Sequence, residues 1–300
     1  MRAVLGRLSL FVGAFALVAA AVSIFWGKDA AYRIPLDTDS YTRLTGQASG
    51  SLAKSDTPVD VTYIVHTQVD PKHSNGDVIA MEQTSCMALT SEYCIDGSGK
   101  FVLAGTDEQI VNIAHKAFAI DRKSSWPVKD QSKYILDASL VEPYEGVVVK
   151  FPFNTKKKDY PYWDSTLGAT TTAVYKGERT IRGLTTYRFD VDIPATQAEI
   201  AAGTQGTYAA TQTVWVDPKT GSFIDQTGTQ KVTLPDGTNV LDVAVKYTDQ
   251  TIADNVKTAK SNKRSLGLVG TLARYYAPFI GIAFVALGVW LLRRRPAAKA

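Results

Sequence analysis

The chain has 300 residues, of which 33 are Lys or Arg and 29 are Asp or Glu, and 45% are hydrophobic. The excess of positive charge comes from the two ends of the chain. The middle is therefore close to neutral, without the basic character that a nucleic-acid-binding domain needs. Its roughly 250 residues are enough for one large domain or two small ones.

Two apolar segments lie near the ends, at residues 8–26 and 275–292. Each is about as long as the roughly 20 residues that a helix needs to cross a bilayer. Basic residues flank them in tails that carry no acid: Arg2, Arg7, Arg293, Arg294, Arg295 and Lys299. The positive-inside rule then predicts that both termini are cytoplasmic and that the middle is extracytoplasmic (periplasmic), held to the plasma membrane.

The expected organisation follows from these segments. It comprises a tail and transmembrane helix at 1–27, an extracytoplasmic β domain at 28–250, a juxtamembrane helix at 251–274, a second transmembrane helix at 275–292 and a basic tail at 293–300. A second interpretation takes residues 2–23 as a secretory signal, because Ala19, Ala20 and Ala21 offer small residues for cleavage. Both interpretations export the middle of the chain.

The exported part is predicted to be mainly β. Residues 58–70 alternate between apolar and polar side chains, which is typical of a strand with one wet face. Further strands are expected at 78–89, 110–120, 146–151, 169–175, 184–193, 208–216, 222–234 and 239–247. Residues 110–118 also fit a helical period, and 194–206 is interpreted as a connector or a short helix. An antiparallel sheet with one apolar face must close or stack, so we expect a β-barrel-like or sandwich domain flanked by two transmembrane helices.

One pair of segments repeats a pattern. Residues 118–131 and 214–226 both contain an aromatic strand end, an Asp-x-Lys-Ser/Thr turn, an apolar stretch and Asp-Gln. Duplication of a β-sheet half would explain this, and so would recurrent hairpin chemistry.

The two cysteines are Cys86 and Cys94, both in the exported part. An even number of cysteines in an oxidising compartment predicts a disulfide, which here closes a short local loop. Two free thiols or a redox pair are the alternatives, although the spacing is not C-x-x-C.

No catalytic motif stands out. The three histidines have no metal-ligand spacing, two cysteines cannot build a zinc site alone, and no nucleophile elbow is present. We therefore expect no enzyme activity, no metal and no cofactor.

The densest unusual segment is residues 150–164, with five aromatic residues and four lysines. Its aromatic rings can plug one end of a β core, with Lys156, Lys157 and Lys158 in water. They can also form a cavity mouth, where rings hold acyl or sugar groups and these lysines meet the phosphate of a head group.

In this segment, and at residues 215–221, the chain resembles a family of actinobacterial envelope proteins labelled porin PorA, which includes a protein of lipoglycan biosynthesis. The similarity covers nearly the whole chain, including both anchors and the Phe-Pro-Phe to Tyr-Trp-Asp segment. The resemblance implies a periplasmic β-barrel-like domain with a lipid-binding cavity and a role in lipomannan and lipoarabinomannan assembly. It implies no catalytic residues.

The function expected from this reasoning is non-catalytic binding of a membrane lipid or lipid-linked glycan. Candidates for the apolar lining are Tyr63, Val65, Trp163, Tyr187, Phe189 and Trp215. The alternative is a scaffold for an envelope glycosyltransferase or transporter, with Gly281 and Gly288 allowing close helix packing. A porin is disfavoured because Asp60, Asp190, Asp192, Asp242 and Lys246 occupy the strand faces opposite the apolar ones, which lipid would not tolerate.

Overall fold

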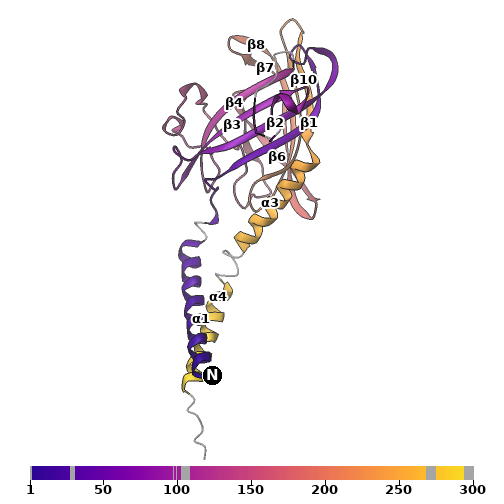
Figure 1. Ribbon diagram of the computed structural model, residues 1–300. Helices are drawn as coiled ribbons and strands as arrows, with labels where there is room; N and C mark the ends of the chain where they lie inside the picture. Colours follow the sequence, from indigo (N-terminus) through magenta and orange to yellow (C-terminus); the bar gives the residue numbers. More distant parts are fainter. Residues whose placement is uncertain are drawn as a thin grey trace, which may run out of the picture. The chain divides into compact units, whose positions relative to one another are not determined.

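The computed structural model describes residues 2–27, 31–96, 98, 100–102, 109–267 and 275–293. The chain divides into two compact units, residues 1–33 with 261–300 and residues 34–260. The first is helical, and the second is built on a β-sheet (Figure 1). The basic residues Arg294, Arg295 and Lys299 of the expected C-terminal tail lie outside the described residues, as does 268–274 of the expected juxtamembrane helix.

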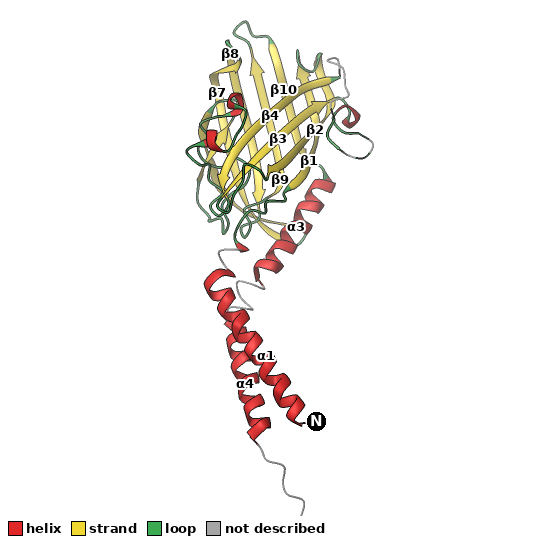
Figure 2. Cartoon of the chain, turned by 60° about the vertical axis from the view of Figure 1, so that its left-hand side comes forward, coloured by secondary structure: helices red, strands yellow, loops and turns green. Residues whose placement is uncertain are grey.

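One antiparallel sheet of ten strands forms the second unit, in the order β4-β3-β2-β1-β10-β9-β8-β7-β6-β5. Figure 2 shows its strands curling around a common interior. Their bounds are β1 Asp39–Gly50, β2 Ser55–Asp70, β3 Val78–Ala88, β4 Ile110–Asp121, β5 Tyr160–Asp164, β6 Ala169–Ile181, β7 Leu184–Ala201, β8 Thr204–Val216, β9 Phe223–Thr233 and β10 Asn239–Tyr247. The prediction of a mainly β, barrel-like domain is confirmed. The described strands form a single sheet, so the two-sheet sandwich is not the arrangement found.

Two ambiguous segments are strands. Residues 110–121 pair with β3 along their length, so cross-strand partners rather than the helical period decide their structure. The expected connector 194–206 is occupied by the end of β7 and the start of β8, joined by a turn in which Gly203 has φ +73°. Pro194 is accommodated at a register shift, where a missing N–H does not break the ladder.

Two other segments also differ from expectation. Strand β1 was not predicted because it is polar and its inward positions include the small residues Gly46 and Ala48. The expected strand at 146–151 is reduced to one bridge, between Val147 and Tyr162, since the following residues bond to a turn instead.

The sheet does not close through its own strands, because its edges β4 and β5 are not neighbours. The connector, residues 122–159, runs between them. It pairs with β4 at Pro127, which bridges Ile120, and with β5 at Val147. Its Gln131 also bonds the backbone of Ala119 through both amide atoms. The connector therefore pairs with part of each edge, with the short turns η3 Gln131–Lys133 and η4 Ala138–Leu140 in between.

The main core lies on the inward face of the sheet. Phe151 of the connector stacks on Phe189 of β7 with ring centroids 4.4 Å apart, and Tyr160 meets both rings edge-on. Helix α3, Asp249–Gly267, covers part of the outward face. Its residues Val256 and Ala259 pack in a buried cluster with Trp215.

The predicted disulfide between Cys86 and Cys94 is confirmed. Both cysteines are fully buried in a small cluster with Ile64, on the outward face of β2 and β3. The bridge fastens the turn η2, Ser91–Tyr93, to the end of β3.

The two segments with a repeated pattern form the same turn. Asp121 and Asp217 each accept hydrogen bonds from the backbone and hydroxyl of the residue three positions on, Ser124 and Thr220. The following residue has positive φ in both turns, 64° at Ser125 and 78° at Gly221. The shared geometry is compatible with both origins considered above.

In the helical unit, α1, Arg2–Val22, runs on into the π-helical turn η1, Ser23–Gly27, and packs against α4, Ala277–Arg293. A Cβ added at Gly13 would lie 2.9 Å from the carbonyl oxygen of Gly281, and one at Gly6 would lie 3.3 Å from that of Gly288. The two helices are therefore antiparallel and in near-backbone contact. Among the described residues, one helix, Arg2–Phe25, is long and apolar enough to cross a membrane, while α4 is a shorter apolar helix.

Candidate functional site

The inward face of the curled sheet combines buried and accessible side chains. The register places Tyr63 and Val65 of β2 on this face, opposite Met87 and Ser85 of β3. Neither Tyr63 nor Val65 is fully buried. Partly accessible inward residues on other strands are Gln83, Ala114, Lys116, Ala210, Gln212, Gln230 and Val245. Protein side chains therefore do not cover the whole inward face.

A charged group interrupts this face. Lys116 of β4 pairs with Gln83 and points inward, near Asp164 of β5 and Glu142 of the connector. Burial lowers the pKa of the Lys116 ammonium, and the two carboxylates oppose that shift. A partly accessible cation beside two carboxylates can bind hydroxyl or charged groups of a ligand.

Two buried tyrosines, Tyr162 and Tyr208, adjoin Asp164. The hydroxyl of Tyr208 donates to Asp164 Oδ2 at 3.0 Å. Burial raises the pKa of Tyr162 to about 12 and raises the pKa of Tyr63, Tyr208 and Tyr247 as well. These hydroxyls are therefore neutral at physiological pH and act as hydrogen-bond donors and acceptors.

The six predicted lining residues fall into three places. Tyr63, Tyr187 and Phe189 belong to the main inward cluster, and Val65 shares their face. Trp163 lies in a second cluster with Phe118. Trp215 lies on the outward face, 4.1 Å from the guanidinium carbon of Arg179, and so does not face the interior.

Trp163 marks the seam between the sheet edges. The ring of Tyr144, from the connector, lies 5.6 Å from Trp163 of β5 and 6.1 Å from Phe118 of β4. The indole of Trp163 donates to Glu142 at 3.1 Å. Side chains of the connector, rather than a strand pair, fill this seam.

The three predicted head-group lysines precede β5 and are exposed. Lys157 forms an ion pair with Glu178 and lies 5.6 Å from the ring of Tyr187. Lys158 lies 5.3 Å from the ring of Tyr160. The lysines therefore border the aromatic end of the inward face without lining it.

Sequence reasoning missed Lys116, Asp164 and Tyr208. The signal available for Lys116 is its alternation with Ala114 and Phe118, which places a lysine on the inward face of β4. That signal could not be used while residues 110–118 also fitted a helix. The contact of Asp164 with Tyr208 joins β5 to β8, which are not neighbours, and had no local pattern.

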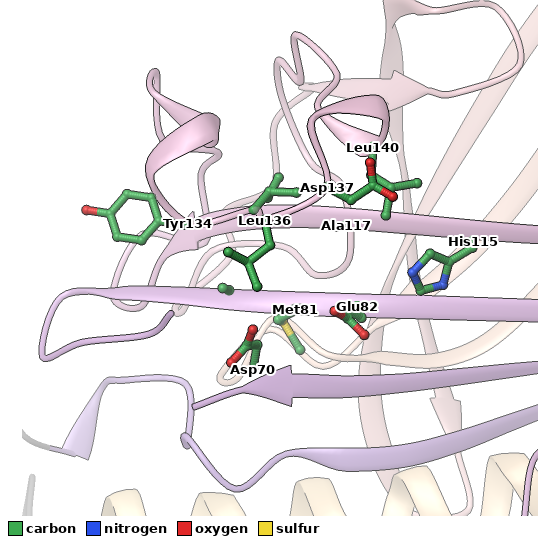
Figure 3. A pocket seen from close by; sticks show the side chains of 11 residues that line it. Asp70, Met81, Glu82, His115, Ala117, Tyr134, Leu136, Asp137 and Leu140 are labelled. Carbon is green, nitrogen blue, oxygen red and sulfur yellow. The ribbon is translucent and has the colours of Figure 1, made fainter. Parts of the chain in front are cut away.

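A separate pocket of about 250 Å³ lies over β3 and β4. Figure 3 shows Glu82 and His115 beneath the connector loop that carries Leu136 and Asp137. These polar groups already have partners, since His115 bonds Thr84 and Asp137 caps η4. Leu136 is 80% exposed, so the pocket is shallow and open.

No group of three or more His, Cys, Asp or Glu residues within the described ranges is arranged to hold a metal ion. Comparison with curated proteins finds no match. The family model Porin PorA matches residues 5–290, so the chain belongs to the porin PorA family.

Proposed function

We propose that this protein binds a lipid or lipid-linked glycan on the inward face of its curled sheet and takes part, without catalysis, in lipoglycan assembly or transport. Membership of the PorA family makes it an envelope protein with a β-barrel-like fold. The observation that carries the proposal is an inward face both apolar and partly accessible, with Lys116 and the buried tyrosines beside it.

The chemistry of this face suits an amphipathic ligand. Acyl chains can pack against Tyr63, Val65 and Tyr187, which stay partly accessible, because burial of apolar surface is favourable wherever protein does not already cover it. Phe189 is fully buried and belongs to the core beside them. Hydroxyl or phosphate groups can bond Lys116 and the glutamine amides. The apolar helices α1 and α4 would hold the domain at the membrane that supplies such a ligand.

A pore is the second candidate, favoured by the family's name and by the charges on the inward face. The outward face argues against it. Asp60, Asp192, Asp242 and Lys246 are exposed there, and Asp190 shares that face. A strand that crosses lipid needs an apolar band on this side, and each misplaced charge is costly.

The test places a bulky side chain in the interior of the curled sheet, from strand β2. Val65→Trp places a bulky ring on the inward face of β2, and Gln68→Trp is the matched control on its outward, exposed face. Both full-length proteins are purified, and their organic extracts are analysed by mass spectrometry. We expect Val65→Trp to lose most of a specific co-purified lipid and Gln68→Trp to retain it.

Equal lipid content in the two variants, with unchanged thermal unfolding, would contradict binding at this face. An empty wild-type interior with a reproducible membrane-enzyme partner would instead favour the scaffold. Stepwise conductance in planar bilayers that Val65→Trp blocks would favour the pore.

A further inference from the structure

The turns at one end of the sheet form a surface that we call the basic end. It consists of the turns at 70–78, 121–126, 181–184 and 217–222 together with residues 150–159. Because the strands are antiparallel, alternate turns gather at this end, and the others gather at the opposite end.

The second compact unit, residues 34–260, is here called the strand unit. The chain enters and leaves this unit at the basic end. The backbone N–H of Ile34 donates to the carbonyl of Arg122 at 2.9 Å, and Arg122 Nε donates back to the carbonyl of Ile34 at 2.8 Å. On the other side, Lys260 Nζ donates to the carbonyl of Arg182 at 2.7 Å. The first connection is short, since the seven residues from Gly27 to Ile34 span at most about 25 Å.

Basic residues outnumber acids on this surface. They are Lys72, Arg122, Lys123, Lys156, Lys157, Lys158, Arg182 and Lys219, against Asp70, Asp77, Asp121, Asp159 and Asp217. Lys150 is left out because its amine packs between two turns, on Ser125 and the ring of Phe153. Three of the acids, Asp70, Asp121 and Asp217, accept bonds from the backbone of their own turns. Lys156 and Lys158 are exposed, so their charges face solvent.

The opposite end has the reverse charge. Its described turns carry Glu92, Asp96 and Asp236, against Lys54 and Lys100. The strand unit is therefore electrically polar from end to end. An anionic surface attracts one end and repels the other.

We propose that the basic end docks on an anionic phospholipid surface. The negative potential of such a surface falls off within a Debye length of about 8–10 Å, so it acts on the groups at one end of the domain. The free-energy contributions of the lysines add. Each lysine therefore changes the equilibrium constant for contact between the basic end and the lipid surface about fivefold. This inference rests on the membrane anchoring in the proposed function but not on the ligand.

The experiment uses the full-length protein in two kinds of vesicle, phosphatidylcholine alone and phosphatidylcholine with phosphatidylglycerol at about 7:3. A single cysteine is introduced at Thr185→Cys, beside the basic end, or at Thr204→Cys, at the opposite end. Both threonines are exposed and each stands at or next to the start of a strand, which makes them matched positions. A fluorophore on the cysteine is quenched by a spin label on the lipid head groups, and Cys86 and Cys94 do not react because they are bridged.

We expect stronger quenching at 185 than at 204, an increase at 185 with phosphatidylglycerol, and loss of that increase in 0.5 M salt. Lys156→Gln with Lys158→Gln should lower the equilibrium constant for contact by about 25-fold. Lys54→Gln with Lys100→Gln, at the opposite end, should leave it unchanged.

Equal quenching at the two positions, or quenching at 185 that is the same in both kinds of vesicle, would overturn the docking proposal. Protein that fails to float with either vesicle would instead contradict the anchoring. The organic extracts of the Lys156→Gln, Lys158→Gln variant are analysed as well. If quenching falls while the lipid is retained, membrane docking and ligand binding are separate properties.

Discussion

Lys150 joins the two turns of repeated pattern, and its surroundings disfavour its charge. Its Nζ donates to Ser125 Oγ at 2.9 Å in one turn and lies 3.8 Å from the ring of Phe153. Burial lowers the pKa of Lys150 to about 7, and the carboxylate of Asp217 in the other turn opposes that shift. The amine is thus part of the packing between the turns.

The sign of the pH dependence follows from this shift. Between about pH 7 and the ordinary lysine value of 10.5, the unfolded chain binds a proton that the folded protein has lost, so stability rises with pH across that window. Replacing Lys150 by Met removes the contribution of this amine to the pH dependence of stability. We expect the difference in unfolding midpoint, variant minus wild type, to be larger at pH 6 than at pH 9 in thermal melts. A difference independent of pH would show that the amine keeps an ordinary pKa.

Gly221 is constrained in two ways at once. It has φ +78°, and a Cβ there would lie 1.9 Å from the carbonyl oxygen of Phe151. Gly203 has a similar φ of +73° but nothing within 4 Å of its Cβ position. We expect Gly203→Ala to cost about 1–2 kcal/mol for the left-handed backbone. Gly221→Ala should cost a further 1–3 kcal/mol, on the order of an overpacked site. Chemical denaturation of both variants measures the difference, and equal costs would mean that the connector moves aside freely.

At the scale of elements, the contact between α1 and α4 depends on four glycines at matched spacing, Gly6 and Gly13 on one helix and Gly281 and Gly288 on the other. Small residues allow backbones to approach closely, which is what drives helix association in lipid. If α1 were removed as a secretory signal, α4 would lose this partner.

Gly13→Leu should separate the helices, because a Cβ at this position already lies 2.8 Å from the backbone nitrogen of Val285. Ala14→Leu is the matched control, since Ala14 is exposed on the same helix. We expect faster hydrogen exchange in both α1 and α4 for Gly13→Leu in detergent micelles, and wild-type exchange for Ala14→Leu. Slow exchange in both variants would show that the glycine contact is dispensable.

For the whole molecule, the sequence predicted what depends on local alternation and missed what depends on distant contacts. Alternation placed Tyr63 and Val65 on one face of β2 and led to the correct class of fold. It also suggested that Trp215 lines the interior, yet the side chain faces outward under α3. Its position follows from the register of β8 with β7 and β9, which no local pattern reveals.

In the candidate site, too, the sequence predicted residues placed by local alternation and missed those brought together by distant contacts. Tyr187 and Phe189 were expected on the inward face and lie there, because they alternate with Arg188 and Asp190. The group formed by Lys116, Glu142 and Asp164 was not expected, since its members come from β4, the connector and β5. These three side chains meet because the sheet curls and so brings its two edge strands, β4 and β5, near one another.

The uncompleted ring of strands has a consequence for solubility. Two strand edges with unpaired amides are the usual starting point for edge-to-edge growth of β-structured fibres. In this protein a single stretch of chain pairs with part of each edge, through Pro127 on one side and Val147 on the other. Excision of residues 127–147 would remove both bridges together, and both edges would then be open to pairing with other copies of the chain.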